Sequence, residues 1–175
     1  DGRVFVIESH THFRPEDYKG PKEDRILAFS DVDGDGKADK KEIYFDGGMH
    51  TMSIAPGGKG CFYVATRSQV YRLKDENGDG KADKKEILVA LKTIGKYPHN
   101  GLCGLALTSD RSRLYFGLGE NLGKPYEIIS HDGKTEISRL KGGGEGGNIY
   151  SYDIETGLLT RIATGFWNPF GICLT

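Results

Sequence analysis

Two short segments of the sequence carry acidic or amide side chains at every second position. The first, DVDGDGKAD, begins at Asp31, and the second, DENGDGKAD, begins at Asp75. Both fit a Ca²⁺ loop, in which positions 1, 3, 5, 7 and 9 face the ion and a glycine makes the sharp turn at position 6. The pattern predicts two Ca²⁺ sites, and the alternative is an acidic hairpin that binds no ion. The predicted ligands are Asp31, Asp33, Asp35, Lys37 and Asp39 in the first loop, and Asp75, Asn77, Asp79, Lys81 and Asp83 in the second.

The residues on either side of these loops alternate as they do in β-strands. RILAFS precedes the first loop and EIYF follows it, whereas an EF-hand needs a helix on each side of its loop. Glu42 and Glu86 fall at position 12, but they follow a strand-forming turn that would carry them away from the ion. The pattern therefore predicts a structural Ca²⁺ site that stabilises a β-hairpin.

The acidic loops are part of a longer repeat. RILAFSDVDGDGKADKKEI begins at Arg25 and QVYRLKDENGDGKADKKEI begins at Gln69, an offset of 44 residues, and a weaker third copy, NIYSYDIETG, begins at Asn148. A period of about 40–45 residues with strands and no helix is typical of the blades of a β-propeller. We therefore expect an all-β fold built from four-stranded antiparallel blades.

Twelve segments have the pattern of strands, which amounts to about three blades. A propeller needs about four to eight blades to close a ring, so we expect an incomplete ring completed by the remaining blades of a longer protein or by a second copy. The third blade carries an insertion, with an extra hairpin expected at Asp132-Gly133. The predicted strands are Val4–Glu8, Ile26–Phe29, Glu42–Phe45, Met52–Ala55, Phe62–Thr66, Val70–Leu73, Glu86–Leu91, Leu105–Thr108, Leu114–Leu118, Ile149–Tyr152, Leu158–Ala163 and Phe170–Leu174.

These strands divide the chain into four parts of one partial propeller domain, 1–175. Naming the strands of a blade A to D from the axis outward, residues 1–48 supply strands B, C and D of the first blade. Residues 49–95 form the second blade, 96–164 the third blade with its insertion, and 165–175 the first strand of the next blade.

Four of the five histidines fall in connections that a propeller gathers on one face, away from the Ca²⁺ loops. His50 and His99 precede an innermost strand, and His10 and His12 lie in a connection between strands B and C. Taken singly, each would be an ordinary surface or core histidine. The convergence predicts a polar site instead. Candidate substrate-binding residues there are His10, His12, Arg14, His50, Asn100, Trp167 and Asn168, with Glu120 and Asn121 on the same face.

Composition excludes several other classes of protein. The 24 basic and 25 acidic residues nearly cancel, so no nucleic-acid-binding face is expected. No apolar run approaches the roughly 18 residues that a membrane span needs. The three cysteines show no paired spacing and are expected as buried free thiols. GGGEGG, from Gly142 to Gly147, lacks the features of a phosphate-binding loop and is expected to be a flexible connection.

The segments PHNGLCGLALTSDRSRLYFGLGENLG and GGNIYSYDIETGLLTRIATGFWNPFGICLT resemble blades of the soluble quinoprotein glucose/sorbosone dehydrogenases. A closer resemblance is to the dehydrogenase-like propeller of large secreted planctomycete-type proteins, to which ESHTHFRP, the two acidic loops and GFWNPFG are similar. This resemblance implies half of a six-bladed ring. It also implies a secreted or periplasmic location and, in many relatives, a c-type cytochrome domain that would accept electrons.

The resemblance further implies a site for oxidation of a sugar or alcohol by pyrroloquinoline quinone. In the quinoprotein group, a histidine before an inner strand takes a proton from the sugar hydroxyl, and His99 is similar in placement, so it is the candidate catalytic residue. The group's Gly-x-Arg-Asn-Pro segment uses its arginine to contact the quinone. Trp167 stands at the matching position, so that charged contact is missing, and the indole would instead stack on a sugar ring.

Two functions of different classes follow from these observations. One is a calcium-stabilised, quinone-dependent sugar or alcohol dehydrogenase domain. The other is a non-catalytic propeller that binds carbohydrate or a partner protein. A basic residue elsewhere on the histidine face would favour the first function, whereas only aromatic and amide side chains there would favour the second.

Overall fold

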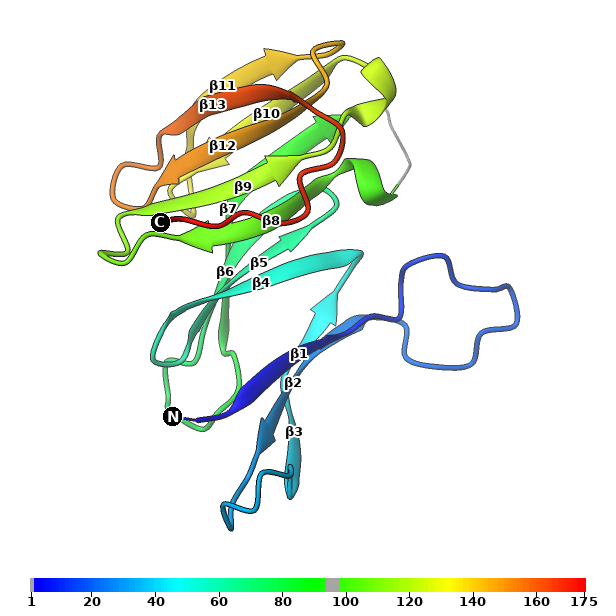
Figure 1. Ribbon diagram of the computed structural model, residues 1–175, viewed down its shortest axis with the longest axis vertical. Coiled ribbons are helices and arrows are strands. Elements are labelled where there is room, and N and C mark those ends of the chain that lie inside the picture. Colours follow the sequence, from blue (N-terminus) through cyan, green and yellow to red (C-terminus); the bar gives the residue numbers. More distant parts are fainter. Residues whose placement is uncertain (1, 94–97) are drawn as a thin grey trace.

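Tight glycine turns and alternating apolar residues fold this chain into consecutive antiparallel hairpins. The computed structural model describes residues 2–93 and 98–175, and within them three antiparallel sheets account for nearly all the regular structure (Figure 1). The chain is therefore all-β, as the sequence predicts. The division between the second and third predicted blades, at residues 95 and 96, lies outside the described residues.

The three sheets follow one another along the chain, except that β10 and β11, which lie between β9 and β12, belong to the second sheet. The first has the order β1-β2-β3, the second β11-β10-β7-β6-β5-β4 and the third β13-β12-β9-β8. Two three-residue 3₁₀ turns, η1 (Pro98–Asn100) and η2 (Asn121–Gly123), complete the described elements. The strands are β1 (Val4–Glu8), β2 (Asp24–Ser30), β3 (Lys40–Gly48), β4 (Thr51–Gly58), β5 (Cys61–Thr66), β6 (Gln69–Lys74), β7 (Lys84–Thr93), β8 (Leu102–Leu107), β9 (Arg113–Leu118), β10 (Tyr126–His131), β11 (Glu136–Gly142), β12 (Gly147–Asp153) and β13 (Leu159–Phe166).

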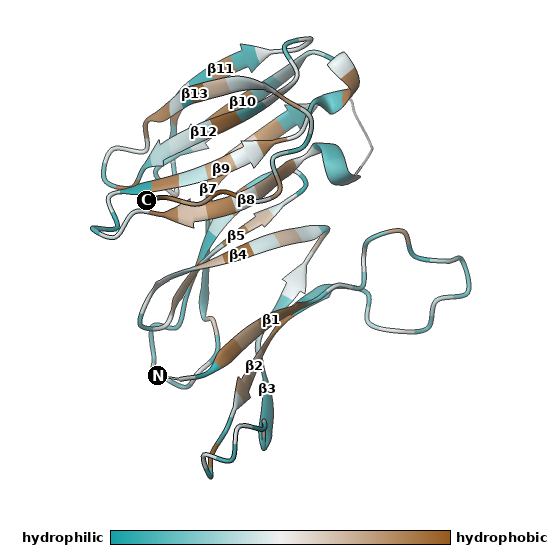
Figure 2. Ribbon diagram, in the orientation of Figure 1, coloured by the Kyte–Doolittle hydropathy of each residue, from teal (hydrophilic) through white to brown (hydrophobic). Residues whose placement is uncertain are grey.

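The second sheet lies between the other two and contributes to both hydrophobic cores. Successive residues of a strand point to opposite faces of the sheet. On β5, Val64 packs with the first sheet and Ala65 packs toward the third, and neither is exposed. Apolar residues accordingly gather on central strands such as β5, β8 and β9, whereas the connection after β1 is mostly hydrophilic (Figure 2). The apolar run CFYVAT is thus the signature of a strand buried on both sides.

The hairpin predicted at Asp132-Gly133 is present as β10 and β11, but it extends the second sheet rather than the third. β10 pairs with β7 from Tyr126 opposite Thr93 to Ser130 opposite Val89. The second sheet therefore has six strands, where the sequence predicted four. The Tyr126 hydroxyl connects the extended second sheet to the third, because it hydrogen-bonds to Glu145 (2.6 Å) and to Tyr150 on β12 (2.7 Å).

The prediction of a strand at Phe170–Leu174 is wrong. Within the described part of the chain no strand pairs with this segment, and an isolated strand leaves its backbone groups without partners. The segment instead crosses β8 and β9, where glycines at 104 and 117 allow close approach. A Cβ at Gly104 or Gly117 would lie 2.6 Å from the carbonyl oxygen of Pro169, so these positions require glycine.

No helix in the described part of the chain is long and apolar enough to cross a membrane.

Candidate functional site

The carboxylate of Asp24, at the start of β2, joins two connections that are distant in the sequence. It accepts hydrogen bonds from the backbone N–H groups of His10 (2.6 Å), Thr11 (2.8 Å) and Thr51 (2.7 Å), and from the Thr11 hydroxyl (2.9 Å). Burial alone would raise the pKa of Asp24, but these hydrogen bonds outweigh it and hold the pKa below its ordinary value. The carboxylate is therefore charged at neutral pH and ties the β1–β2 connection to the β3–β4 turn.

The backbone beside this carboxylate adopts a conformation that non-glycine residues rarely use. The His50 N–H donates to Thr11 Oγ1 (2.6 Å), and His50 has a φ of 52°. Phe13, directly after His12, has a φ of 47°. Positive φ values in bulky residues cost free energy and persist where surrounding contacts enforce them, often at functional sites. The Asp24–Thr11 hydrogen bonds supply such contacts here.

The hydrogen-bonded residues Asp24 and Thr11 are called the Asp24 frame below. Three histidines from three separate connections meet beside this frame. His12 Nε2 lies 3.4 Å from His99 Nε2, and the ring centroids of His12 and His50 are 6.3 Å apart. Burial lowers the pKa of both His12 and His50. The neighbouring His99 lowers the pKa of His12 further, and Arg67 lowers that of His50 further. His12 and His50 are therefore neutral at pH 7 and able to accept a proton or to bind a metal ion.

Polar residues from η1, from the connection after β9 and from the segment after β13 border the histidines. Asn100 donates to Glu120 Oε1 (2.8 Å). The Asn168 side chain and the Asn100 backbone both crowd Gly119, so any Cβ at that position would clash. The amide of Asn168, oriented to satisfy its neighbours, accepts from Trp167 Nε1 at 3.3 Å. Asn100, Glu120 and Asn168 thus lie together at this end of the sheets.

Trp167 and Phe170 add aromatic surface here. The Trp167 side chain is 76% exposed, so its indole face is available to a ligand. The Phe170 ring centroid lies 6.2 Å from that of His99, with the two rings nearly perpendicular.

Two predicted site residues point elsewhere. The His10 imidazole contacts Tyr18 Oη (2.5 Å) and Glu8 Oε2 (3.1 Å), so its side chain serves the β1–β2 connection. Arg14 donates to the carbonyl of Lys22 (3.3 Å) on the exposed surface, and its charge still contributes to lowering the pKa of His50.

Sequence reasoning missed three residues that organise the site. Asp24 and Thr11 form its frame, and Arg67, whose N–H donates to the His50 carbonyl (3.0 Å), brings a positive charge. That charge lowers the pKa of both His12 and His50. For Arg67 the available signal was its place in the β5–β6 turn, a connection of the same type as the one that holds His12.

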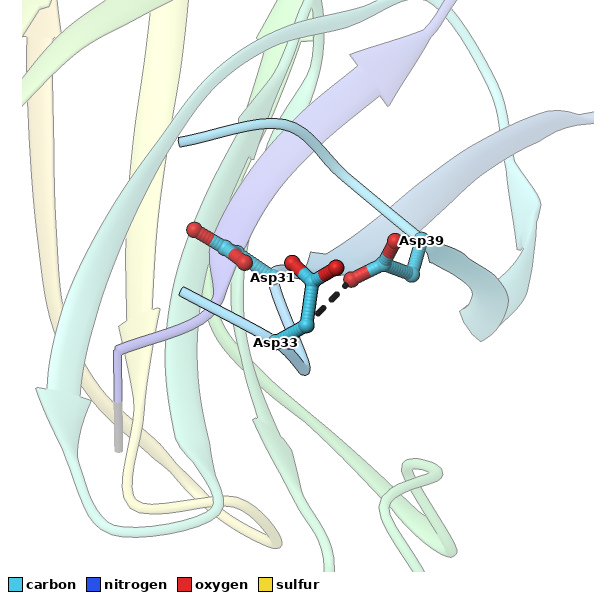
Figure 3. Close-up of side chains that lie close together, drawn as sticks. All are labelled: Asp31, Asp33 and Asp39. Carbon is cyan, nitrogen blue, oxygen red and sulfur yellow. Dashed lines mark hydrogen bonds between the residues drawn. The ribbon is translucent and has the colours of Figure 1, made fainter. Parts of the chain in front are cut away.

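The first acidic loop, between β2 and β3, lies at the end of the sheets opposite the β1–β2 connection (Figure 1). Oxygen atoms of Asp31, Asp33 and Asp39 lie within 4.8 Å of one another, and Figure 3 shows these three side chains gathered on the turn. Asp35 points elsewhere, because its carboxylate accepts from the backbone N–H (2.8 Å) and Nζ (3.2 Å) of Lys37. Oxygen ligands on a tight turn are the donor set that Ca²⁺ prefers, so the loop fits this ion.

The second acidic loop, between β6 and β7, repeats the first. Asp75 accepts from the N–H groups of Gly78 (2.6 Å) and Gly80 (2.9 Å), as Asp31 does from Gly34 (2.7 Å) and Gly36 (2.8 Å). Asp83 accepts from the Asn77 N–H (3.2 Å), in the role of Asp39. Asp79 accepts from the Lys81 N–H (2.8 Å). The two loops therefore share one backbone conformation.

The two glutamates at position 12, Glu42 on β3 and Glu86 on β7, form ion pairs with basic residues. Glu86 forms ion pairs with Arg72 (2.7 Å) and Lys84 (3.0 Å), and Glu42 forms one with Lys40 (3.0 Å). Strands, not helices, flank both loops, as the sequence predicts.

Comparison with known protein families gives a match over residues 1–172 to the model described as Domain of unknown function (DUF7133). No curated protein matches the chain.

Replacing Asp24 tests the frame. Asp24→Ala leaves three backbone N–H groups without their acceptor, two of them buried and that of His10 partly buried, so we expect the free energy of unfolding to fall by at least about 2 kcal/mol. Asp46→Ala removes an exposed carboxylate that pairs with Arg25 (3.0 Å), and should cost less than about 1 kcal/mol. Urea unfolding measures both variants, and equal losses would contradict the role assigned to Asp24.

Proposed function

The chain belongs to the DUF7133 family, and from its own residues and its sequence resemblance we propose that it is part of a calcium-stabilised β-propeller in a secreted or periplasmic protein. Its histidine site would oxidise a sugar or alcohol with a quinone, as in the quinoprotein dehydrogenases that the sequence resembles. The observation that carries this proposal is the meeting of His12, His50 and His99 beside Arg67.

The sheet order supports the propeller. β4-β5-β6-β7 and β8-β9-β12-β13 are both four-stranded antiparallel series in chain order, and β1-β2-β3 would be a similar series without its first strand. β4 and β8, the expected inner strands, lie in contact. This is the relation expected of adjacent blades around an axis.

A hollow beside β1 supports the idea that further blades complete the ring. In the described residues β1 pairs with β2 alone. The hollow between β1 and the β4–β5 hairpin measures about 820 Å³, and its lining includes Phe5, Ile54 and Phe62. An innermost strand from a second copy or from the rest of a longer protein would pair with β1 and cover these apolar side chains.

The residues at the histidine site have distinct roles in this reaction. Histidine is the side chain best suited to accept a proton near neutral pH, so His99 would take the proton of the substrate hydroxyl. When bound, the quinone would supply the acceptor for the hydride. A carboxylated quinone needs a cationic neighbour, and Arg67 offers that charge even though Trp167 replaces the arginine of the resembled family. Asn100 and Asn168 would orient the sugar through hydrogen bonds.

Trp167 favours the second candidate function, a propeller that binds carbohydrate without oxidising it. Its exposed indole can stack on a sugar ring without any quinone. The charge of Arg67 beside the histidines favours the enzyme, so we retain carbohydrate binding as the alternative.

Dye reduction with quinone, Ca²⁺ and a panel of sugars tests the enzyme. His99→Ala should lower turnover by about 10²–10⁴-fold because the proton acceptor is lost, whereas Trp167→Ala should mainly weaken sugar binding. His131→Ala removes a histidine on β10, away from the site, and should change neither. Sugar binding that depends on Trp167 without any turnover would establish the alternative, and if neither turnover nor binding responds to these variants, both candidates are wrong.

Calcium binding forms a separate prediction. Both loops should bind Ca²⁺ with dissociation constants of about 10⁻⁴–10⁻³ M, the range of extracellular modules, and the first loop should bind more tightly because it has one more carboxylate. Binding to the folded state alone raises the melting temperature. Calorimetry should show that Asp31→Ala loses the Ca²⁺ site of the first loop and that Asp75→Ala loses the site of the second. The control Asp17→Ala should keep both sites. A melting temperature unchanged by chelator, with no heat of binding, contradicts the prediction.

A further inference from the structure

We propose that His12 and His99, with His50 as a third ligand, form a binding site for a divalent transition-metal ion of the Zn²⁺ class. The site lies at the opposite end of the sheets from the acidic loops and uses nitrogen instead of oxygen ligands. It does not depend on the oxidation of a sugar or on a quinone.

The separation of the two nitrogens is the first argument. In a tetrahedral zinc site each Zn–N bond measures about 2.0–2.1 Å, which puts two imidazole nitrogens about 3.3–3.4 Å apart. His12 Nε2 and His99 Nε2 lie 3.4 Å apart. The same separation is long for a hydrogen bond between them, because good N–H hydrogen bonds measure about 2.7–3.2 Å. The pair therefore has the spacing of two ligands on one ion.

The type of ligand atom is the second argument. His12, His50 and His99 each offer an imidazole nitrogen and no oxygen ligand. Neutral imidazoles select Zn²⁺, Cu²⁺ and Ni²⁺, whereas Ca²⁺ prefers the oxygen atoms of the acidic loops.

The backbone that holds the rings is the third argument. His50 is tied through Thr11 Oγ1 (2.6 Å) to the residue that directly precedes His12, and Thr11 is itself fixed by Asp24. The His12 and His50 rings thus share one anchored frame, with centroids 6.3 Å apart. The nitrogens of the three histidines do not all lie within 4.8 Å of one another, so His50 would have to turn toward the pair to become the third ligand, which would leave the fourth position of a tetrahedral ion to water.

A metal ion at this site would compete with the proposed reaction. Once Nε2 of His99 holds a metal ion, it has no lone pair to accept a proton from a substrate hydroxyl. Zn²⁺ would therefore inhibit the dehydrogenase, if the chain is one, and would bind equally well if it is not.

Binding of Co²⁺, a spectroscopic probe for Zn²⁺ sites, tests the proposal on the full chain. We expect His12→Ala and His99→Ala each to weaken Co²⁺ binding by at least tenfold and to remove the visible absorption of a tetrahedral ion. His131→Ala, which removes an imidazole on β10, and Asp31→Ala, which removes an oxygen ligand of the first acidic loop, should leave both unchanged. Affinity retained in His12→Ala and His99→Ala, or lost in Asp31→Ala, overturns the proposal. So does a thiolate charge-transfer band, which would assign the metal to a cysteine.

Nuclear magnetic resonance of the histidine rings keeps the test valid if a variant fails to fold. In the unaltered protein Zn²⁺ should shift the Nε2 signals of His12 and His99, and leave those of His10 and His131 in place. Shifts confined to His10 or His131, or no shift at all at saturating Zn²⁺, would contradict the site.

Discussion

The hydrogen bonds to the buried Asp24 carboxylate are the constraint on which the functional end of this molecule depends. Four donors from His10, Thr11 and Thr51 converge on one side chain. An unpaired buried carboxylate or backbone N–H is costly, so these groups stabilise the fold only together. The connection after β1 and the turn before β4 are therefore held together. The backbone of the histidines in these connections is thereby fixed relative to the strands.

The two ends of the sheets have opposite chemistry for a reason of topology. Antiparallel strands joined in chain order send alternate connections to opposite ends. The β2–β3 and β6–β7 connections carry oxygen-rich acidic turns, whereas the β1–β2, β3–β4 and β5–β6 connections carry histidines and Arg67. The carboxylate oxygens and the imidazole nitrogens thereby lie at opposite ends of the strands.

Features that depend on local sequence could be predicted, and features that depend on distant contacts could not. The acidic loops were predictable because glycine and aspartate at alternate positions specify a turn by themselves. The hairpin at Asp132-Gly133 was predictable for the same reason, but its pairing with β7 was not, since that pairing joins residues distant in the sequence, such as Ile128 and Leu91. The segment Phe170–Leu174 has the apolar pattern of a strand, yet a strand also requires a neighbour to pair with.

The functional site shows the same division. The convergence of His12, His50 and His99 followed from the repeat, because the repeat fixes which connections share an end. The role of Asp24 could not be predicted, since its partners lie 14 and 27 residues away and an aspartate at the start of a strand is unremarkable. His10 and Arg14 were assigned to the site because they lie in a connection between strands B and C, but the His10 imidazole contacts Tyr18 and the Arg14 guanidinium donates to the carbonyl of Lys22.

The central claim is that His12 and His99 meet in a partly buried site on the Asp24 frame. A pH titration of the His12 ring by nuclear magnetic resonance tests it most directly. Burial and the neighbouring His99 should hold the pKa of His12 below the ordinary value of 6.5, and His99→Ala should raise it by removing a repelling charge. A His12 pKa at or above 6.5 that does not respond to His99→Ala would contradict the account.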